Sequence, residues 1–211
     1  SRAGINFYSA RYLMTAQNDT DALEFLKSNN ATHVLFVSDD IGKYPAYSSI
    51  GSDLEYDRYS WIPVFGLDPS QTQETRNGSQ YVYAGSAVFD EDVTYDGKIF
   101  PARNSGVGAF VLSFRAVEGV EGSVGLAQPY AIAVYNNQQT SIPLTCLYVN
   151  GQYVRFEGEG LGGCLRLVPT YSNGALNPLG GAIYLSERTK DSLFARRYIF
   201  DEPSESFELV Y

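Results

Sequence analysis

The stretch Leu147-Tyr-Val-Asn150-Gly151-Gln-Tyr-Val154 sets the character of the middle of this chain. Two runs of β-prone residues flank an Asn-Gly pair. A two-residue hairpin loop of type I′ needs positive φ angles at both central residues, and asparagine followed by glycine meets that need best. The stretch therefore predicts a β-hairpin with its turn at Asn150 and Gly151.

The same pattern extends on both sides of this hairpin, from about residue 80 to residue 185. Short β-prone runs alternate there with glycine, proline and asparagine, and they cover residues 81–84, 109–114, 130–135 and 144–149. Short strands separated by turn residues are typical of all-β structure. The 17 tyrosines of the chain agree with this, because one ring face can pack while the hydroxyl reaches water.

Helical patterns occur before and after this β-prone region. Residues 20–29 follow a capping residue, Asn18 or Thr20, and carry an apolar stripe at helical spacing. Residues 186–200 begin with a serine that can cap them and show an apolar face as well. Residues 207–211 are β-prone and predict a last strand.

A continuous apolar run at residues 33–37 predicts a buried strand. We interpret His33, the single histidine, as a hydrogen-bonded side chain of that strand rather than as a catalytic base. The strand would place Asp39 and Asp40 at its carboxyl end, where α/β units often carry working groups. Residues 45–51 would then form a short helix that begins at a proline and stops at a glycine.

These patterns together predict an α+β fold in a single globular domain of 211 residues. A helical and αβ core would come from both chain ends, residues 1–66 and 186–211. The β-rich insertion would span about 80–185.

Charge and composition exclude several classes of partner. The net charge is −9 and no cluster of Lys and Arg is visible, which argues against nucleic acid and anionic lipid surfaces. No apolar run approaches the roughly 18 residues that a membrane span requires. Three Asn-X-Ser/Thr sequons, at Asn18, Asn30 and Asn77, permit an extracytoplasmic location without demanding it.

Two acidic stretches are candidate sites. Asp90, Asp92 and Asp96 could offer oxygen ligands to calcium, but the run lacks the glycine and terminal glutamate of an EF-hand loop. A solvated hairpin tip explains this run better than a metal site does. Glu157 and Glu159 could suggest a glycosidase pair, yet no other feature supports a sugar cleft, and surface charge explains them better.

The two cysteines, Cys146 and Cys164, lie 18 positions apart and lack the paired spacing of a zinc site. Outside the cell they could form a disulfide, and two buried thiols are the alternative. Both interpretations remain open at this stage.

Asp40 and Lys43 have the i,i+3 spacing of an ordinary surface salt bridge, which stabilises a helix by only a few tenths of a kcal/mol. The sequence around them nevertheless resembles a known family. The strings that carry the resemblance occur in that family's order and are Ser9-Ala-Arg-Tyr-Leu-Met14, Asp21-Ala-Leu-Glu-Phe-Leu26, His33-Val-Leu-Phe-Val37, Asp40-Ile-Gly-Lys43-Tyr-Pro-Ala-Tyr47, Ser192-Leu-Phe-Ala-Arg-Arg-Tyr-Ile-Phe200 and Phe207-Glu-Leu-Val-Tyr211.

The family is the globular C-terminal domain of archaeal oligosaccharyltransferase catalytic subunits, which this chain resembles at both ends. The family's motif DxxKxxx(M/I) lies on a kinked helix that lines the pocket for the Ser or Thr of the acceptor sequon. Asp40 and Lys43 match its first two positions, and Tyr47 stands where Met or Ile is usual. The family's second pocket motif, WWDYG, is absent and normally lies upstream, so we expect the chain to begin after it.

The resemblance implies an extracytoplasmic domain excised from a larger protein of the cell membrane. The whole enzyme would transfer a dolichol-type, lipid-linked oligosaccharide to the Asn of Asn-X-Ser/Thr in an acceptor polypeptide. Its Mn²⁺ or Mg²⁺ and the catalytic carboxylates would belong to the N-terminal transmembrane region, so this domain alone is expected to be inactive. A non-enzymatic cell-surface or adhesion module, suggested by the Tyr-rich β region and the acidic composition, is the alternative.

Overall fold

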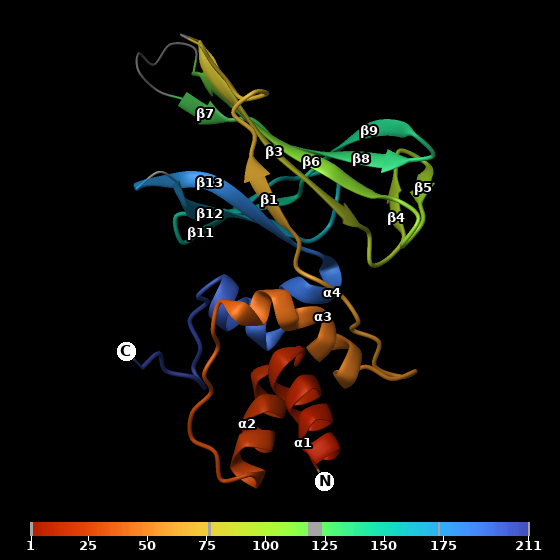
Figure 1. Ribbon diagram of the computed structural model, residues 1–211, viewed down its shortest axis with the longest axis vertical. Coiled ribbons are helices and arrows are strands. Elements are labelled where there is room, and N and C mark those ends of the chain that lie inside the picture. Colours follow the sequence, from red (N-terminus) through yellow and green to blue (C-terminus); the bar gives the residue numbers. More distant parts are fainter. Residues whose placement is uncertain (1, 76, 118–123, 173, 211) are drawn as a thin grey trace. The chain divides into compact units, whose positions relative to one another are not determined.

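The computed structural model describes residues 2–75, 77–117, 124–172 and 174–210 (Figure 1). The chain is a strand-rich mixture of helices and strands, which confirms the predicted α+β class. The chain divides into two compact units. A helical unit comprises Ser1–Ile62 and Leu185–Tyr211, and a strand unit comprises Pro63–Tyr184. Each unit is described by itself.

The helical unit contains three α-helices from the first part of the chain and one short α-helix from the last part. Two single π-helical turns continue or follow them, and in each turn an N–H donates to the carbonyl five residues earlier, as from Thr15 to Ala10 at 3.0 Å. The elements are α1 (Arg2–Ser9), η1 (Ala10–Met14), α2 (Asp19–Ser28), α3 (Asp39–Gly51), α4 (Glu187–Lys190) and η2 (Ala195–Ile199).

Helix α2 confirms the helix predicted at residues 20–29 to within one residue. Asn18 caps it, because its side-chain oxygen accepts a hydrogen bond from the backbone N–H of Asp21 at 2.9 Å. Ala22 and Leu26 are buried on its inner face.

Asp19, at the start of α2, ties this helix to the C-terminal segment. Its carboxylate accepts hydrogen bonds from Arg196, Arg197 and Ser204, each at 2.7 Å. Both arginine contacts are ion pairs in which every side chain is less than one fifth exposed. An early and a late segment of the chain therefore meet at one carboxylate.

Helix α3 begins earlier than predicted. The short helix expected at residues 45–51 is wrong at its start, because α3 begins at Asp39 and carries Pro45 in its interior. Proline has no N–H to donate within a helix, which normally makes it a poor interior residue. Tertiary contacts hold the helix across it: the buried Tyr44 stacks on Phe194 at 5.9 Å, and the Ser48 hydroxyl donates to the Ser60 carbonyl at 2.8 Å.

The buried strand predicted at residues 33–37 is wrong. This segment is not in any strand, and the side chains of Leu35 and Val37 are 84% and 42% exposed. His33 is also exposed, and its Nδ1 lies 2.8 Å from the Thr32 hydroxyl oxygen. Phe36 packs edge to face with Phe194 at 5.4 Å. An apolar run needs a neighbouring strand to become part of a sheet, and the described helical unit contains no sheet.

The C-terminal helix and strand also differ from the prediction. Residues 186–200 form α4 and the π turn η2 rather than one helix, and Leu193 between them donates its N–H to the Ala16 carbonyl at 2.7 Å. That bond to another segment interrupts the helix. The last strand predicted at residues 207–211 is wrong for 207–210, which are irregular, and Tyr211 lies outside the described residues.

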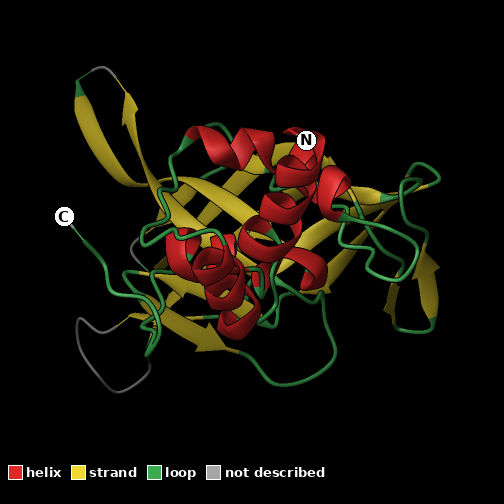
Figure 2. Cartoon of the chain, turned by 90° about the horizontal axis from the view of Figure 1, so that it is seen from below, coloured by secondary structure: helices red, strands yellow, loops and turns green. Residues whose placement is uncertain are grey.

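The strand unit is built on one curled sheet, drawn in yellow in Figure 2. The order along it is β11-β10-β12-β13-β1-β3-β6-β8-β9, with β2 paired to β3 and β7 paired to β6, while β4 and β5 form a separate ribbon. Strands β10 and β12 run parallel, whereas β10 with β11 and β3 with β6 are antiparallel. The strands are β1 (Val64–Leu67), β2 (Gln73–Thr75), β3 (Gly78–Val88), β4 (Val93–Tyr95), β5 (Lys98–Phe100), β6 (Gly106–Ala116), β7 (Val124–Leu126), β8 (Tyr130–Tyr135), β9 (Gln138–Pro143), β10 (Cys146–Val149), β11 (Gln152–Arg155), β12 (Cys164–Ser172) and β13 (Ala175–Leu185).

The hairpin predicted at Asn150 and Gly151 is confirmed. These residues join β10 to β11 with φ angles of 50° and 77°, and Val149 pairs with Gln152 across the turn. The aromatic rings and aliphatic side chains that point inward from the sheet form the core of this unit, in which Phe65 and Phe110 meet edge to face at 4.8 Å. Further fully buried members are Tyr83, Leu112, Ala131, Ile142, Leu144, Leu147, Leu161, Leu165 and Ala182.

Candidate functional site

The first turn of α3 positions the carboxylate of Asp40. The Asp40 N–H donates to the Val37 carbonyl at 2.9 Å, and the Val37 N–H donates to Asp40 Oδ2 at 3.0 Å. This reciprocal pair resembles a capping box and fixes the direction in which the chain enters the helix. Asp40 is only 8% exposed. Its carboxylate is therefore held by the backbone beside it rather than by solvent.

Tyr47 lies two turns further along α3, and its hydroxyl donates to Asp40 Oδ1 at 3.4 Å. Burial raises the pKa of the Tyr47 hydroxyl, and the negative charge of Asp40 and the hydrogen bond to it raise that pKa further. The phenol therefore stays protonated at neutral pH. Asp40 and Tyr47 form a connected polar pair on one face of the helix.

The side chain of Lys43 is exposed on α3. It forms no ion pair or hydrogen bond with any residue that the structure describes. In particular, the salt bridge that the i,i+3 spacing predicts between Asp40 and Lys43 is not formed. Asp40 instead accepts from Val37 and Tyr47. The Lys43 ammonium keeps three N–H donors for a hydroxyl or carbonyl oxygen that comes from outside this unit.

The helix that carries these residues is held tightly against η1. A Cβ atom added to Gly51, the last residue of α3, would lie 2.9 Å from the carbonyl carbon of Ala10 and 2.9 Å from the nitrogen of Arg11. Real side chains do not come so close to a backbone, so glycine is what permits this approach. The position of Asp40, Lys43 and Tyr47 in the helical unit is thus set at both ends of α3.

The segment that follows α3 is rich in aromatic residues between positions 56 and 61, and its contacts hold it against η1. The Tyr56 hydroxyl donates to the Thr15 carbonyl at 2.7 Å, and the guanidinium of Arg11 lies over the Tyr56 ring at 4.5 Å. Arg11 also pairs with Asp53. This hydrogen bond from Arg11 lowers the pKa of the Asp53 carboxyl. The contacts anchor the segment after α3 to η1, and nothing in the sequence spacing indicated them.

The acidic residues considered for calcium are not brought together. Asp90 and Asp92 precede β4, whereas Asp96 lies in the turn after it. Asp92 Oδ1 accepts from the Ala102 N–H at 2.8 Å, and the Asp96 N–H donates to Glu159 Oε1 at 3.1 Å. Across the described residues, no group of three or more His, Cys, Asp or Glu side chains lies close enough to hold a metal ion.

Cys146 and Cys164 form a disulfide in the strand unit. They stand at the starts of β10 and β12, next to the parallel pair Leu147 and Leu165, and their Cα atoms are 4.6 Å apart. Both cysteines are 1% exposed. Of the two interpretations that the sequence left open, the structure has the bonded one.

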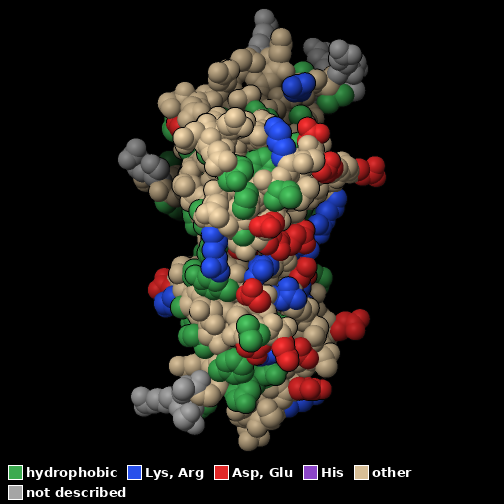
Figure 3. Space-filling view, turned by 90° about the vertical axis from the view of Figure 1, so that its right-hand side faces the viewer, with side chains coloured by type: hydrophobic (Ala, Val, Ile, Leu, Met, Phe, Trp, Pro, Cys, Tyr) green, Lys and Arg blue, Asp and Glu red, His purple; other side chains and the backbone are tan. Residues whose placement is uncertain are grey.

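The face drawn in Figure 3 shows mixed charge rather than a basic patch. On this face, Lys and Arg side chains alternate with Asp and Glu. In the part of the chain that the structure describes, no helix combines the length and the apolar character that crossing a bilayer requires.

Comparisons with known proteins give no match to this chain: no protein-family model, no curated protein and no solved structure matches it.

Proposed function

We propose that this chain is the extracytoplasmic C-terminal domain of an archaeal-type oligosaccharyltransferase, and that α3 contributes to recognition of the acceptor polypeptide. The proposal is supported by the resemblance of Asp40-x-x-Lys43 and the flanking segments to that family, and one observation in the structure carries it. The Asp40 carboxylate is buried and hydrogen-bonded, while the ammonium group of Lys43 is exposed and has no partner among the described residues.

The division of roles follows from these contacts. Asp40 is a positioning residue, because it fixes the entry to α3 and holds the Tyr47 hydroxyl. Lys43 donates a hydrogen bond to the hydroxyl of the Ser or Thr in the acceptor sequon. The Tyr47 ring, which stands where the family has Met or Ile, packs beside the methyl group of a Thr. Lys43 and Tyr47 contact the acceptor, Asp40 positions the helix that carries them, and none of the three takes part in bond making.

The enzyme to which the domain belongs would be a membrane glycosyltransferase. It would transfer an oligosaccharide from a dolichol-type lipid carrier to the Asn of Asn-X-Ser/Thr. Mn²⁺ or Mg²⁺ would supply electrostatic stabilisation of the departing phosphate, held by carboxylates of the N-terminal transmembrane region. The domain itself would hold the acceptor peptide on the outer side of the membrane and would be inactive without that region.

The experiment that tests this proposal uses the full-length protein with its transmembrane region, lipid-linked oligosaccharide, Mn²⁺ and a sequon peptide. Lys43→Ala is expected to raise the KM for the peptide at least fivefold and to leave kcat within about twofold, because binding in the ground state is lost. Lys27→Ala, which removes another exposed lysine from the helical unit, is the matched control and should leave both constants unchanged.

Folding is measured alongside transfer. Lys43→Ala should unfold at the temperature of the parent, since the Lys43 side chain is exposed and forms no ion pair or hydrogen bond with a described residue. Asp40→Asn should lower both peptide affinity and the unfolding temperature, because Val37 and Tyr47 lose a charged acceptor. A parent enzyme that transfers nothing would refute the assignment to this family. A parent that is active but indifferent to Lys43→Ala would refute only the role of α3.

The alternative is a non-enzymatic cell-surface or adhesion module, and the disulfide of the strand unit supports it as well, because both functions place the chain outside the cytoplasm. The same transfer assay decides between the two functions, because an adhesion module has no glycosyl transfer to lose.

A further inference from the structure

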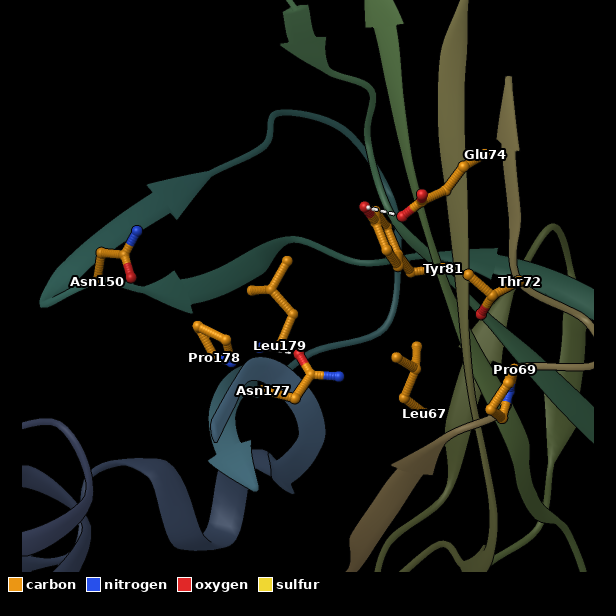
Figure 4. A pocket seen from close by; sticks show the side chains of 9 residues that line it. All are labelled: Leu67, Pro69, Thr72, Glu74, Tyr81, Asn150, Asn177, Pro178 and Leu179. Carbon is orange, nitrogen blue, oxygen red and sulfur yellow. Dashed lines mark hydrogen bonds between the residues drawn. The ribbon is translucent and has the colours of Figure 1, made fainter. Parts of the chain in front are cut away.

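A cleft of about 690 Å³ opens in the strand unit and plays no part in the proposed function (Figure 4). Its size lies in the range of small-molecule sites. Its walls come from the stretch that runs from the end of β1 through β2 into β3, from the β10–β11 turn and from the start of β13. Residues more than 100 positions apart therefore meet there. The side chains that matter for its chemistry are Leu67, Thr72, Glu74, Tyr81, Asn177 and Leu179.

The cleft has one rigid aromatic surface. The Tyr81 ring packs edge to face against Phe114, with ring centres 5.9 Å apart, and its hydroxyl donates to Glu74 Oε1 at 3.0 Å. Leu67 and Leu179 are half-buried and share the cleft with the ring. Figure 4 shows Tyr81 and Leu179 bordering the same space. Together they make an apolar surface held in place before any ligand arrives.

Polar groups with unused hydrogen-bonding capacity stand around this surface. Glu74 uses one carboxylate oxygen for Tyr81, and its second oxygen has no partner among the described residues. Asn177 uses its carbonyl oxygen to accept from the Leu179 N–H at 3.0 Å, which leaves its NH₂ group as a fixed donor. Asn150, on the neighbouring turn, is exposed and adds a second amide.

We propose that this cleft binds a neutral carbohydrate. A pyranose ring presents a face of C–H groups that packs on an aromatic ring, and hydroxyls around its rim that donate and accept hydrogen bonds. The Tyr81 ring matches the face, the Glu74 carboxylate accepts from hydroxyls, and the amides of Asn177 and Asn150 donate to them and accept from them. The fixed charge of Glu74 disfavours a sugar that carries a carboxylate of its own.

Other ligand classes fit this cleft less well. A proline-rich peptide needs a groove lined by several aromatic side chains, and Tyr81 is the one aromatic residue in this lining. A phosphorylated ligand needs Lys or Arg, and the lining contains neither. The combination of a single ring, one carboxylate and two amides fits hydroxyl-rich, uncharged compounds.

The test titrates the whole chain with methyl glycosides and follows the amide signals of the cleft residues by NMR. The neutral probes are the methyl glycosides of glucose, galactose, mannose and N-acetylglucosamine, and the acidic probe is methyl glucuronide, which differs from methyl glucoside by one carboxylate. We expect at least one neutral glycoside to bind at the cleft with a millimolar dissociation constant, and glucuronide to bind at least fivefold more weakly than glucoside.

Three variants localise the interaction. Tyr81→Ala should weaken binding at least tenfold, whereas Tyr81→Phe should retain it within about threefold because the ring remains. Glu74→Gln keeps the shape of the side chain and should remove the discrimination against glucuronide. Tyr171→Ala, which truncates a tyrosine that is 78% exposed and lies outside the cleft, is the control and should bind like the parent.

The proposal is overturned if no neutral glycoside perturbs the cleft at tens of millimolar, or if the perturbed residues lie elsewhere. Binding of a hexaproline peptide at the cleft in place of the sugars would overturn it as well. If Tyr81→Ala does not fold, Glu74→Gln provides the test. A variant that still binds glucuronide more weakly than glucoside would show that the sugar does not lie beside Glu74, and the proposal would be overturned. None of these outcomes depends on oligosaccharyl transfer, so this proposal and the proposed function fail independently.

Discussion

At the scale of single residues, Asp19 shows how much one carboxylate holds in place. Burial of Asp19 acts to raise its pKa, but hydrogen bonds from Ser204, Arg197 and Arg196 outweigh burial and lower that pKa to about 2 from an ordinary 3.8. The charged form is therefore favoured in the folded protein. An acid whose folded pKa is lowered stabilises the fold above its unfolded pKa and stops doing so as the pH falls through the folded value.

The first prediction is that Asp19→Asn lowers the free energy of unfolding by about 2 kcal/mol at pH 7. The difference between parent and variant should shrink between pH 4 and pH 2, because the parent loses the same charge there. Urea unfolding at pH 7, 4 and 2 measures it.

The control for this prediction is Asp39→Asn, which removes an exposed carboxylate at the start of α3. It should change the free energy of unfolding by no more than about 0.5 kcal/mol at any of these pH values. A pH-independent loss in Asp19→Asn would contradict the role given to its charge.

At the scale of secondary-structure elements, replacing each of two glycines of α3 by alanine should change the stability of the protein in opposite directions. Gly51→Ala forces a Cβ against the backbone of Ala10 and Arg11, so we expect a loss of about 1–3 kcal/mol in stability. Gly42 lies in the same helix, and a Cβ there would meet no atom within 4 Å. Gly42→Ala should therefore stabilise the protein by about 0.5–1 kcal/mol through the helix propensity of alanine.

Thermal and urea unfolding of the two variants measure this contrast. If Gly51→Ala were as stable as Gly42→Ala, the close packing of α3 on η1 would not exist in solution. In the assay of the proposed function, Gly42→Ala should retain full peptide affinity because α3 stays in place.

Local signals explain which elements the sequence could predict. The cap at Asn18 and the Asn150-Gly151 turn are decided by the residues themselves, and both elements form as expected. The run at 33–37 has strand-like residues but no neighbouring strand, and the helix expected at 186–200 is interrupted where Leu193 bonds to Ala16. These failures arise from tertiary contacts that a local pattern cannot contain.

The candidate sites also combine features that are visible in the sequence with features that depend on the fold. The spacing of Asp40 and Lys43 is visible in the sequence, but the hydrogen bond from Tyr47 to Asp40 is not, because it requires α3 to continue through Pro45. The cleft in the strand unit could not be predicted at all. Tyr81 and Asn177 are almost 100 residues apart, and only the order of strands in the sheet brings them to one place.

At the scale of the whole molecule, each of the two units contains a feature through which its unfolding can be followed separately. The disulfide lies in the strand unit and joins residues 18 positions apart, so its removal should cost that unit about 3 kcal/mol. The single tryptophan, Trp61, belongs to the helical unit. Reduction should therefore raise the rate of hydrogen exchange in β10 and β12. The melting temperature followed by tryptophan fluorescence, which reports on the helical unit, should change little.

The measurement is hydrogen exchange followed by mass spectrometry with and without reductant, with fluorescence melts recorded on the same samples. The Cys146→Ala/Cys164→Ala variant controls for side effects of the reductant and should behave like the reduced parent. An equal loss of protection in α2 and β10 would show that the two units unfold as one.

The helical unit is made from two segments of this chain, one that is synthesised before the strand unit and one that is synthesised after it. Asp19 and Arg196 are 177 positions apart, so their ion pair cannot form until synthesis has passed the entire strand unit. All of Pro63–Tyr184 is by then available to fold. During vectorial synthesis the strand unit can complete its sheet while α2 and α3 still lack their C-terminal partners. During that interval α2 and α3 lack the C-terminal residues that pack against them, and exposed apolar surface of this kind is what chaperones protect.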